Sequence, residues 1–193
     1  MASQKPYMPS IAFLGKDITE YKANSRKYLS GLHFYCPVHE LELSYHSSYP
    51  RHVRDYKAEI SIHRLGCPLK CCNHTQAILP DFLQPYKHYS ANEIEAVLFD
   101  SKTSNCALDI DSKASISTLR RWITQYLPIL DEKISHLKTN IYQKVRTVVN
   151  EMALANLGAM ETIQSLLLQL PAIHYSNTLG GAFIYGNALD IPT

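Results

Sequence analysis

The stretches Cys36-Pro-Val-His39 and Cys67-Pro-Leu-Lys-Cys71-Cys72-Asn-His74 decide how the rest of the chain is interpreted. Each is a short cluster of thiols and imidazoles that turns through a proline, and residues 40–66 separate the two. This layout is typical of a zinc ribbon, in which two knuckles at the ends of a small β-structure hold one tetrahedral ion. We therefore expect Zn2+ as the cofactor of a small, metal-stabilised unit.

A structural zinc site takes four nitrogen or sulfur ligands. The residues of the right type and spacing are Cys36, His39, Cys67, Cys72 and Cys71. Because Asn73 can adopt the left-handed conformation that a knuckle turn often uses, Cys72 is the preferred fourth ligand, and Cys71 and His74 remain alternatives. Scattered Cys and His can also be ordinary core residues, but two compact clusters with matching prolines favour a metal.

Composition restricts the classes of protein to consider. Lys and Arg number 19 against 17 Asp and Glu, so the net charge of +2 gives no global electrostatic case for nucleic-acid binding, and any basic surface must be local. The first residues lack the apolar core of a signal peptide, and no apolar run approaches the length of a membrane span. We expect a cytoplasmic protein with no membrane partner, whose clustered cysteines bind metal instead of forming disulfides.

The pattern along the chain predicts an α+β fold in four segments. These are a leader and helix (1–31), the zinc ribbon with short antiparallel strands (32–89), a helix-turn-helix-like region (90–128), and a helical hairpin with a C-terminal tail (129–193). In the first segment, Asp17 is placed to cap a helix at about residues 17–30.

Alternating apolar and polar residues identify strands in the ribbon. Residues 41–46 alternate as a half-buried strand does, a polar turn is expected at 47–50, and alternation resumes over 58–65. So small a unit buries little apolar surface, so we expect the ion to supply much of its folding free energy.

Helix-start signals mark the third segment. Ser90-Ala-Asn-Glu93 is a capping box, in which the serine accepts the Glu93 amide and the glutamate reaches back. Residues 106–110 fit a short second helix. Ser115 then caps a third helix that Pro128 is expected to end.

That third helix leaves hydroxyl groups and arginines on its outer side. Such side chains near a helix N-terminus are what a recognition helix presents to phosphates and guanine edges. The candidate DNA-binding residues are Lys113, Ser115, Ser117, Thr118, Arg120, Arg121 and Gln125, with Arg51 and Arg54 from the ribbon. An ordinary amphipathic helix with a solvated basic side accounts equally well for the spacing alone.

Apolar spacing beyond residue 128 predicts a long helix to about Leu157, broken by Gly158, and a second helix from Ala159 to Leu170. We expect the two to form a hairpin that packs on the helix-turn-helix region or against a second copy of the chain. Residues 175–193 show no clear period.

The order of elements resembles a bacterial family of zinc-ribbon proteins encoded in or near transposable elements. The most specific shared motif is Ile78-Leu-Pro-Asp-Phe-Leu-Gln-Pro-Tyr-Lys-His-Tyr-Ser90, and the segments Ile11 to Tyr21 and Ser115 to Trp122 are also similar. His39 stands where the family usually has Cys, and the second knuckle is longer than usual. The resemblance covers residues 10–127 and implies a DNA-associated accessory protein of a mobile element, with no established activity.

No constellation typical of an enzyme is present in the sequence. It lacks a three-carboxylate nuclease pattern, a His-hydrophobic-His metal motif and a Gly-rich phosphate loop, and four ligands close the zinc site to substrate. We therefore expect a protein without catalysis or a small-molecule substrate, which binds duplex DNA with a homo-oligomer or transposition-complex proteins as partners. The alternative is a protein–protein adaptor or oligomerisation module with structural zinc only. A third hypothesis is single-strand or RNA binding, with bases stacked on tyrosines.

Overall fold

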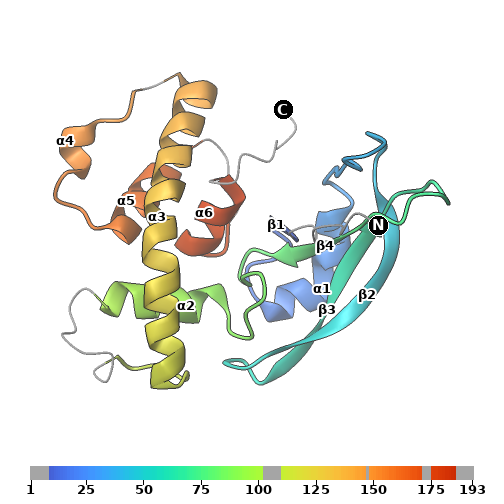
Figure 1. The fold of residues 1–193 in the computed structure, drawn as a ribbon, viewed down its shortest axis with the longest axis horizontal. Coiled ribbons are helices and arrows are strands. Elements are labelled where there is room, and N and C mark those ends of the chain that lie inside the picture. The colour runs from blue at the N-terminus through green and yellow to red at the C-terminus, as the bar shows by residue number, and fades with distance from the viewer. Residues whose placement is uncertain (1–8, 102–109, 147, 171–174, 186–193) are drawn as a thin grey trace, which may run out of the picture.

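The computed structural model describes residues 9–101, 110–146, 148–170 and 175–185. The elements are β1 (Ser10–Ala12), α1 (Ile18–Leu29), β2 (Ser44–Val53), β3 (Ala58–Gly66), β4 (Thr75–Pro80), α2 (Ala91–Asp100), α3 (Ile116–Val145), α4 (Glu151–Leu154), α5 (Ala159–Leu167) and α6 (Thr178–Tyr185). The expected mixture of a sheet with several helices is confirmed. Figure 1 shows the sheet with α1 in one half of the molecule and the helices α2 to α6 in the other.

The four strands form one sheet in the order β1-β4-β3-β2, in which β1 runs parallel to β4 and the other pairs are antiparallel. Helix α1 packs on this sheet: Asp17 caps it as expected, accepting the Glu20 amide at 2.8 Å, and the Tyr21 hydroxyl donates to the Ser61 carbonyl at 2.7 Å. Because β1 and α1 share the sheet's apolar core, the structure does not separate the segment before residue 32 from the ribbon that follows.

The turn expected at residues 47–50 is wrong, because β2 runs without interruption through it. Over the described residues, the only irregularity in its pairing with β3 is a register shift beside His46. Pro50 is tolerated because β2 is the edge strand, where a missing backbone donor need not break a ladder. The chain reverses at residues 54–57 instead, with Lys57 in the left-handed conformation at φ 49°.

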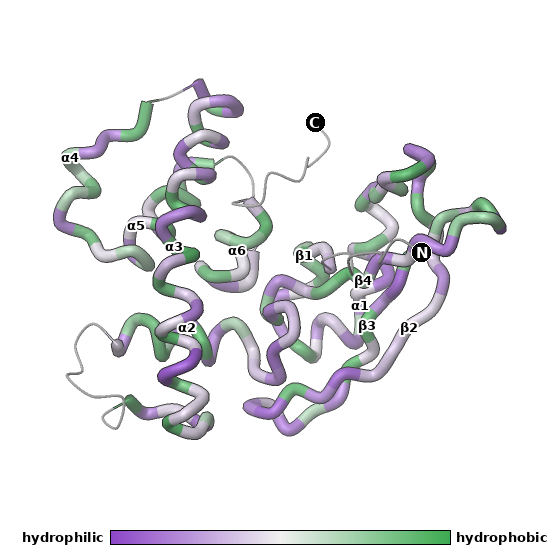
Figure 2. The backbone as a smooth tube through the Cα atoms, in the orientation of Figure 1, coloured by the Kyte–Doolittle hydropathy of each residue, from purple (hydrophilic) through white to green (hydrophobic). Residues whose placement is uncertain are grey.

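Helix α3 continues through Pro128, so the predicted helix end at that residue is wrong and the helix crosses the boundary drawn between residues 128 and 129. Pro128 lies on the exposed side, while Tyr126, Leu130 and Leu137 are buried on the other. Hydrophobic and hydrophilic residues alternate along α3 in Figure 2, as they do when a helix buries one side. Packing of that side therefore outweighs the helix-breaking effect of the proline.

The tail differs from its prediction at both ends. Helix α3 ends at Val145, and the next residue, Arg146, is left-handed at φ 59°, so the prediction of a helix that reaches Leu157 is wrong. Helix α5 agrees with the second predicted helix. The buried helix α6 was not predicted, because its two glycines are poor helix formers. A Cβ on Gly180 would lie 2.4 Å from the Asp81 carbonyl oxygen, so this close approach requires glycine.

Buried polar contacts join the two halves. Asp55, in the β2–β3 turn, accepts the amide and hydroxyl of Ser90, the N-cap of α2, at 3.0 and 2.5 Å. Asp81, which is fully buried after β4, accepts the Ser176 hydroxyl at 2.7 Å. The capping box is therefore half confirmed: Ser90 accepts the Glu93 amide, but the Ser90 amide is bound by Asp55.

The short helix expected at 106–110 falls, apart from Ile110, outside the described residues, as does the end of the chain after residue 185. Across the described ranges, no helix combines the length and apolar character that crossing a bilayer requires.

Replacing Pro128 with Ala should raise the free energy of unfolding by about 2 kcal/mol, because alanine restores a helical hydrogen-bond donor on an exposed face at little steric cost. Urea unfolding followed by circular dichroism measures the change. Equal or lower stability of the variant would indicate that the helix ends at this residue.

Candidate metal centre

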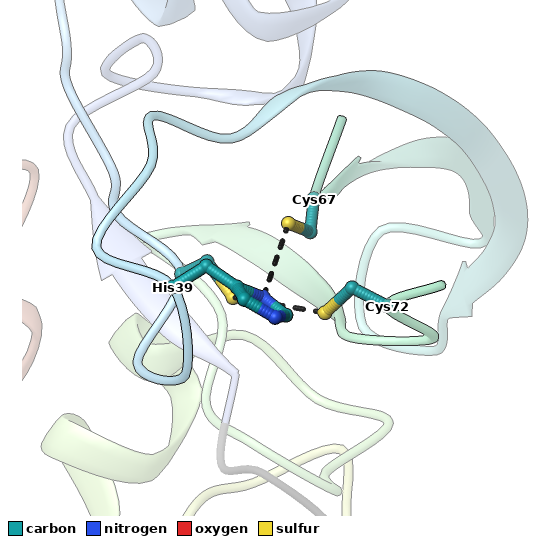
Figure 3. Close-up of side chains that lie close together, drawn as sticks. His39, Cys67 and Cys72 are labelled. Atoms are coloured by element: carbon teal, nitrogen blue, oxygen red, sulfur yellow. Dashed lines mark hydrogen bonds between the residues drawn. The ribbon is translucent and has the colours of Figure 1, made fainter. Parts of the chain in front are cut away.

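Cys36, His39, Cys67 and Cys72 come together at one end of the sheet, as the sequence predicted. Their ligand atoms all lie within 4.8 Å of one another. Figure 3 shows His39, Cys67 and Cys72 pointing toward a common centre. The His39 Nδ1 atom lies 3.7 Å from the Cys36 Sγ and 3.8 Å from the Cys67 Sγ, and the Cys36 and Cys72 Sγ atoms are 3.8 Å apart.

These spacings fit a tetrahedral ion. With metal–sulfur bonds of about 2.3 Å and metal–nitrogen bonds of about 2.0–2.1 Å, neighbouring ligand atoms of a tetrahedron lie about 3.5–3.8 Å apart. The sulfur–sulfur separation of 3.8 Å agrees with that range, and the two nitrogen–sulfur separations of 3.7 and 3.8 Å are slightly longer than a tetrahedral ion requires. The four residues are therefore close enough to hold one metal ion after a small contraction.

Backbone hydrogen bonds shape both knuckles. In the first, the Cys36 amide donates to the Leu41 carbonyl at 2.8 Å, and the Glu40 amide donates back to the Cys36 carbonyl at 2.8 Å, with Glu40 left-handed at φ 55°. In the second, the Cys67 amide donates to the His74 carbonyl at 3.1 Å. Each knuckle is thus a tight loop closed behind its ligands.

The electrostatics of the first knuckle favour a thiolate. Burial by itself raises the pKa of Cys36, but the backbone N–H groups of Val38 and His39, together with the His39 side chain, outweigh it and lower the pKa to about 6. Burial raises the pKa of Cys67, and the neighbouring thiols of Cys72 and Cys36 raise it further. Two thiols so close together cannot both ionise easily unless a cation lies between them.

Among the described residues, the fourth member of the cluster is Cys72. Cys71 is exposed and lies outside the cluster, and His74 contributes its backbone carbonyl to the knuckle and is not among the clustered ligands. Asn73 does not adopt the left-handed conformation that was expected to favour Cys72; the left-handed knuckle residue is Glu40, in the first loop.

The predicted DNA-binding residues lie far from this cluster. The metal ligands flank the Ser44 and Gly66 ends of β2 and β3, whereas the β2–β3 turn forms the opposite end, about 30 Å away for a ten-residue strand. The turn lies beside the N-terminal end of α3, since the Lys113 Nζ donates to the Asp55 carbonyl at 3.2 Å. A metal ion would therefore support the hairpin and would not itself contact a ligand bound at α3.

Most of the polar candidates on α3 are accessible. Exposed side chains are those of Lys113, Ser115, Ser117, Arg120, Arg121 and Gln125, while Thr118 is half-buried. The exposed Arg54 lies 5.9 Å from the Tyr89 ring centre, and Tyr89 packs edge-on against Trp122 of α3.

Arg51 has a structural role instead. Its guanidinium donates to the carbonyls of Gln84 and Lys87, and burial lowers its pKa. The sequence did not single out Lys87, whose ammonium donates to the Gln125 side chain and whose pKa is lowered by burial and by the charge of Arg121. No local spacing marks Lys87, because the loop that carries it reaches α3 only in the folded chain.

Residues 36–122 match the profile of a protein family described as a domain of unknown function (DUF6431). The match includes all four clustered Cys and His residues, strands β2 to β4, α2 and the first part of α3. The comparisons with curated proteins and with solved structures each found no match.

Purified protein should carry one metal ion per chain, and Cys72→Ser should lose most of it because three ligands hold a metal far less tightly. Cys71→Ser is the matched control, one residue away and outside the cluster, and should keep full occupancy. Elemental analysis after dialysis measures both. Equal loss from the two variants would contradict the assignment of the fourth ligand.

Proposed function

We propose that this protein binds duplex DNA without catalysing a reaction, that Zn2+ stabilises its ribbon, and that it serves a mobile genetic element as an accessory or regulatory factor. Three thiols and one imidazole close together suit Zn2+, because structural zinc sites are typically formed by four Cys and His ligands. Elemental analysis that found another metal in stoichiometric amount would contradict zinc.

Six cations on the segments that meet at the junction of the two halves, here called the basic face, carry the proposal. They are Arg54 and Lys57 of the β2–β3 turn, Lys87 of the loop before α2, and Lys113, Arg120 and Arg121 at the start of α3. Contacts of Lys87 with Gln125 and of Lys113 with the Asp55 carbonyl hold these segments together. A net charge near zero for the whole chain therefore coexists with a local cluster of cations, as phosphate binding requires.

The carboxylates of Asp55 and Glu93, close to this face, accept hydrogen bonds from other groups of the protein. Asp55 accepts two hydrogen bonds from Ser90, and Glu93 accepts the Ser112 hydroxyl and the Lys113 amide, each at 2.7 Å. Their negative charges bind backbone and hydroxyl donors of the protein itself. Among the neighbouring cations, Arg54, Arg120 and Arg121 have exposed side chains.

The N-terminus of α3 adds a second source of positive potential. Ser115 makes no capping hydrogen bond to the helix; its hydroxyl lies 3.1 and 3.0 Å from those of Ser117 and Thr118. The Thr118 amide is bound by the Ser115 carbonyl at 2.8 Å, but no acidic side chain in the first turn neutralises the positive end of the helix dipole, an arrangement that favours phosphate. In the proposal, α2 and α3 act as a helix-turn-helix-like pair with α3 as the recognition helix over residues 115–127.

The role in a mobile element rests on the sequence resemblance alone. That resemblance covers residues 10–127 and so includes both the ribbon and the start of α3. Transposition, recombination and regulation are all compatible with a protein that binds DNA and leaves the chemistry to others.

A protein–protein adaptor is the second candidate, favoured by apolar side chains exposed on the tail. Val148 is 79% exposed, Met152 87% and Leu168 75%, although each is hydrophobic. Exposed apolar residues gathered in one part of a chain are typical of an interaction surface. In this alternative the tail docks a partner or a second copy, and the zinc is purely structural.

Random-sequence duplex DNA should bind the metal-loaded protein with an affinity that falls steeply with salt, because phosphate contacts release counterions. Arg121→Ala and Lys113→Ala should each weaken binding at all sequences and lower the salt slope by about 1. Fluorescence anisotropy across a salt series measures both quantities.

Lys144→Ala is the control, since Lys144 is an exposed cation at the opposite end of the same helix. It should leave affinity and slope unchanged. Negligible DNA binding by the folded, metal-loaded protein would overturn the proposal, and a concentration-dependent dimer without DNA affinity would support the adaptor.

A further inference from the structure

A cavity of about 280 Å³ lies between α1 and the β2–β3 hairpin, apart from both the metal cluster and the basic face. Helix α1 contributes Lys22, Ser25 and Arg26 to its lining, and the hairpin contributes Tyr45 and His63. Its volume is near the lower end of the range for small-molecule sites, about 300–1,000 Å³.

The lining of this cavity is cationic. Lys22 and Arg26 lie four residues apart on α1, on the same side of the helix, and no carboxylate of the described residues lines the cavity to neutralise them. The Arg26 guanidinium lies 5.5 Å from the Tyr45 ring centre, which fixes its position over the cavity wall. A ligand there would meet two positive charges beside an aromatic surface.

Hydroxyl groups and a buried imidazole form the floor. The His63 side chain is 5% exposed, and its Nε2 lies 2.9 Å from the Ser25 Oγ. Burial, and then the charge of Arg26, lower the pKa of His63, which favours the neutral ring with one N–H. When Nε2–H donates to Ser25, the Ser25 hydroxyl hydrogen is free to donate to an anionic oxygen.

The buried imidazole of His63 lowers the stability of the fold, which is unexpected for a purely structural residue. Its Nδ1 is buried and has no hydrogen-bond partner among the residues that the structure describes. A buried polar atom left without a partner destabilises a fold, so an apolar side chain at this position would pack at lower cost. The Ser25–His63 pair is better explained by a role in binding.

We propose that this cavity binds a small ligand through a phosphate monoester group, with Lys22, Arg26 and the Ser25 hydroxyl around the phosphate and Tyr45 beside the organic part. A dianion matches the two cations, and charge-assisted hydrogen bonds to them hold it. The phosphate belongs either to a free metabolite or to the 5′ end of a nucleic-acid strand.

No motif in the sequence indicates this site, and the sequence predicts no small-molecule ligand. The expectation rested on the missing Gly-rich phosphate loop, which is a local motif. Here the lining residues come from three separate elements, and only the packing of α1 on the sheet brings them together.

Titration calorimetry with inorganic phosphate, phenyl phosphate and phenol tests the chemistry. We expect both phosphates to bind, phenyl phosphate more tightly, and phenol not to bind. Arg26→Gln and Lys22→Gln should each weaken phenyl phosphate binding by about tenfold, since each removes a charge-assisted hydrogen bond from an exposed position that the fold does not need.

Lys27→Gln is the matched control, because Lys27 is an exposed cation of the same helix that does not line the cavity. The ¹⁵N signals of His63 should shift on saturation in the wild type and in Lys27→Gln. Two single-stranded oligonucleotides, with and without a 5′-phosphate, separate the sources: preference for the phosphorylated strand over phenyl phosphate assigns the ligand to a strand end.

Failure of inorganic and phenyl phosphate to bind at millimolar concentration would overturn the proposal, as would equal affinity of phenol or unchanged affinity in Arg26→Gln. Arg121→Ala, which tests the DNA face, should not affect phenyl phosphate binding. The proposal and the DNA-binding function can therefore fail independently.

Discussion

Four ligand atoms from two distant knuckles must meet at one point, and the sheet half of the molecule depends on this constraint. The knuckle end has little apolar core to hold it: Tyr35, Val38, Leu41 and Leu69 are all exposed there. Two neighbouring thiols also repel each other once both are ionised. The lowered pKa of Cys36, about 6, favours its ionisation at neutral pH. A cation at the centre turns this repulsion into attraction and supplies the folding free energy that burial does not.

The metal centre and the basic face occupy opposite ends of the β2–β3 hairpin, so a rigid hairpin is what relates them. Its far turn is locked to the helical half by Asp55, which holds the N-cap of α2, and by Arg51, which holds the loop after β4. If the knuckles loosened, the hairpin would lose rigidity, and these contacts would position the start of α3 less accurately. In the proposed function, a bound metal would therefore act on DNA binding only by positioning this end of the hairpin.

Local chemistry predicted the cluster and the helix starts, whereas elements that depend on distant partners were mispredicted. The knuckle spacing identified Cys36, His39 and Cys67 and left Cys72 as the preferred of three candidates for the fourth position of the cluster. Asp17 and Ser90 cap their helices as their residue types indicate. Pro128 was misjudged because propensity is local, while the burial of Leu130 and Leu137 is not. The parallel pairing of β1 with β4 and the cavity over His63 join segments too far apart in the chain for any spacing rule to reveal.

Hydrogen exchange with and without a chelator tests most directly whether the metal holds this half together. Removal of the metal should deprotect the Cys36 and Cys67 amides and the ladder between β2 and β3, and leave the buried centre of α3 protected. Unchanged protection of the two knuckle amides after complete metal removal would contradict the account, because the knuckles would then be held by the chain alone.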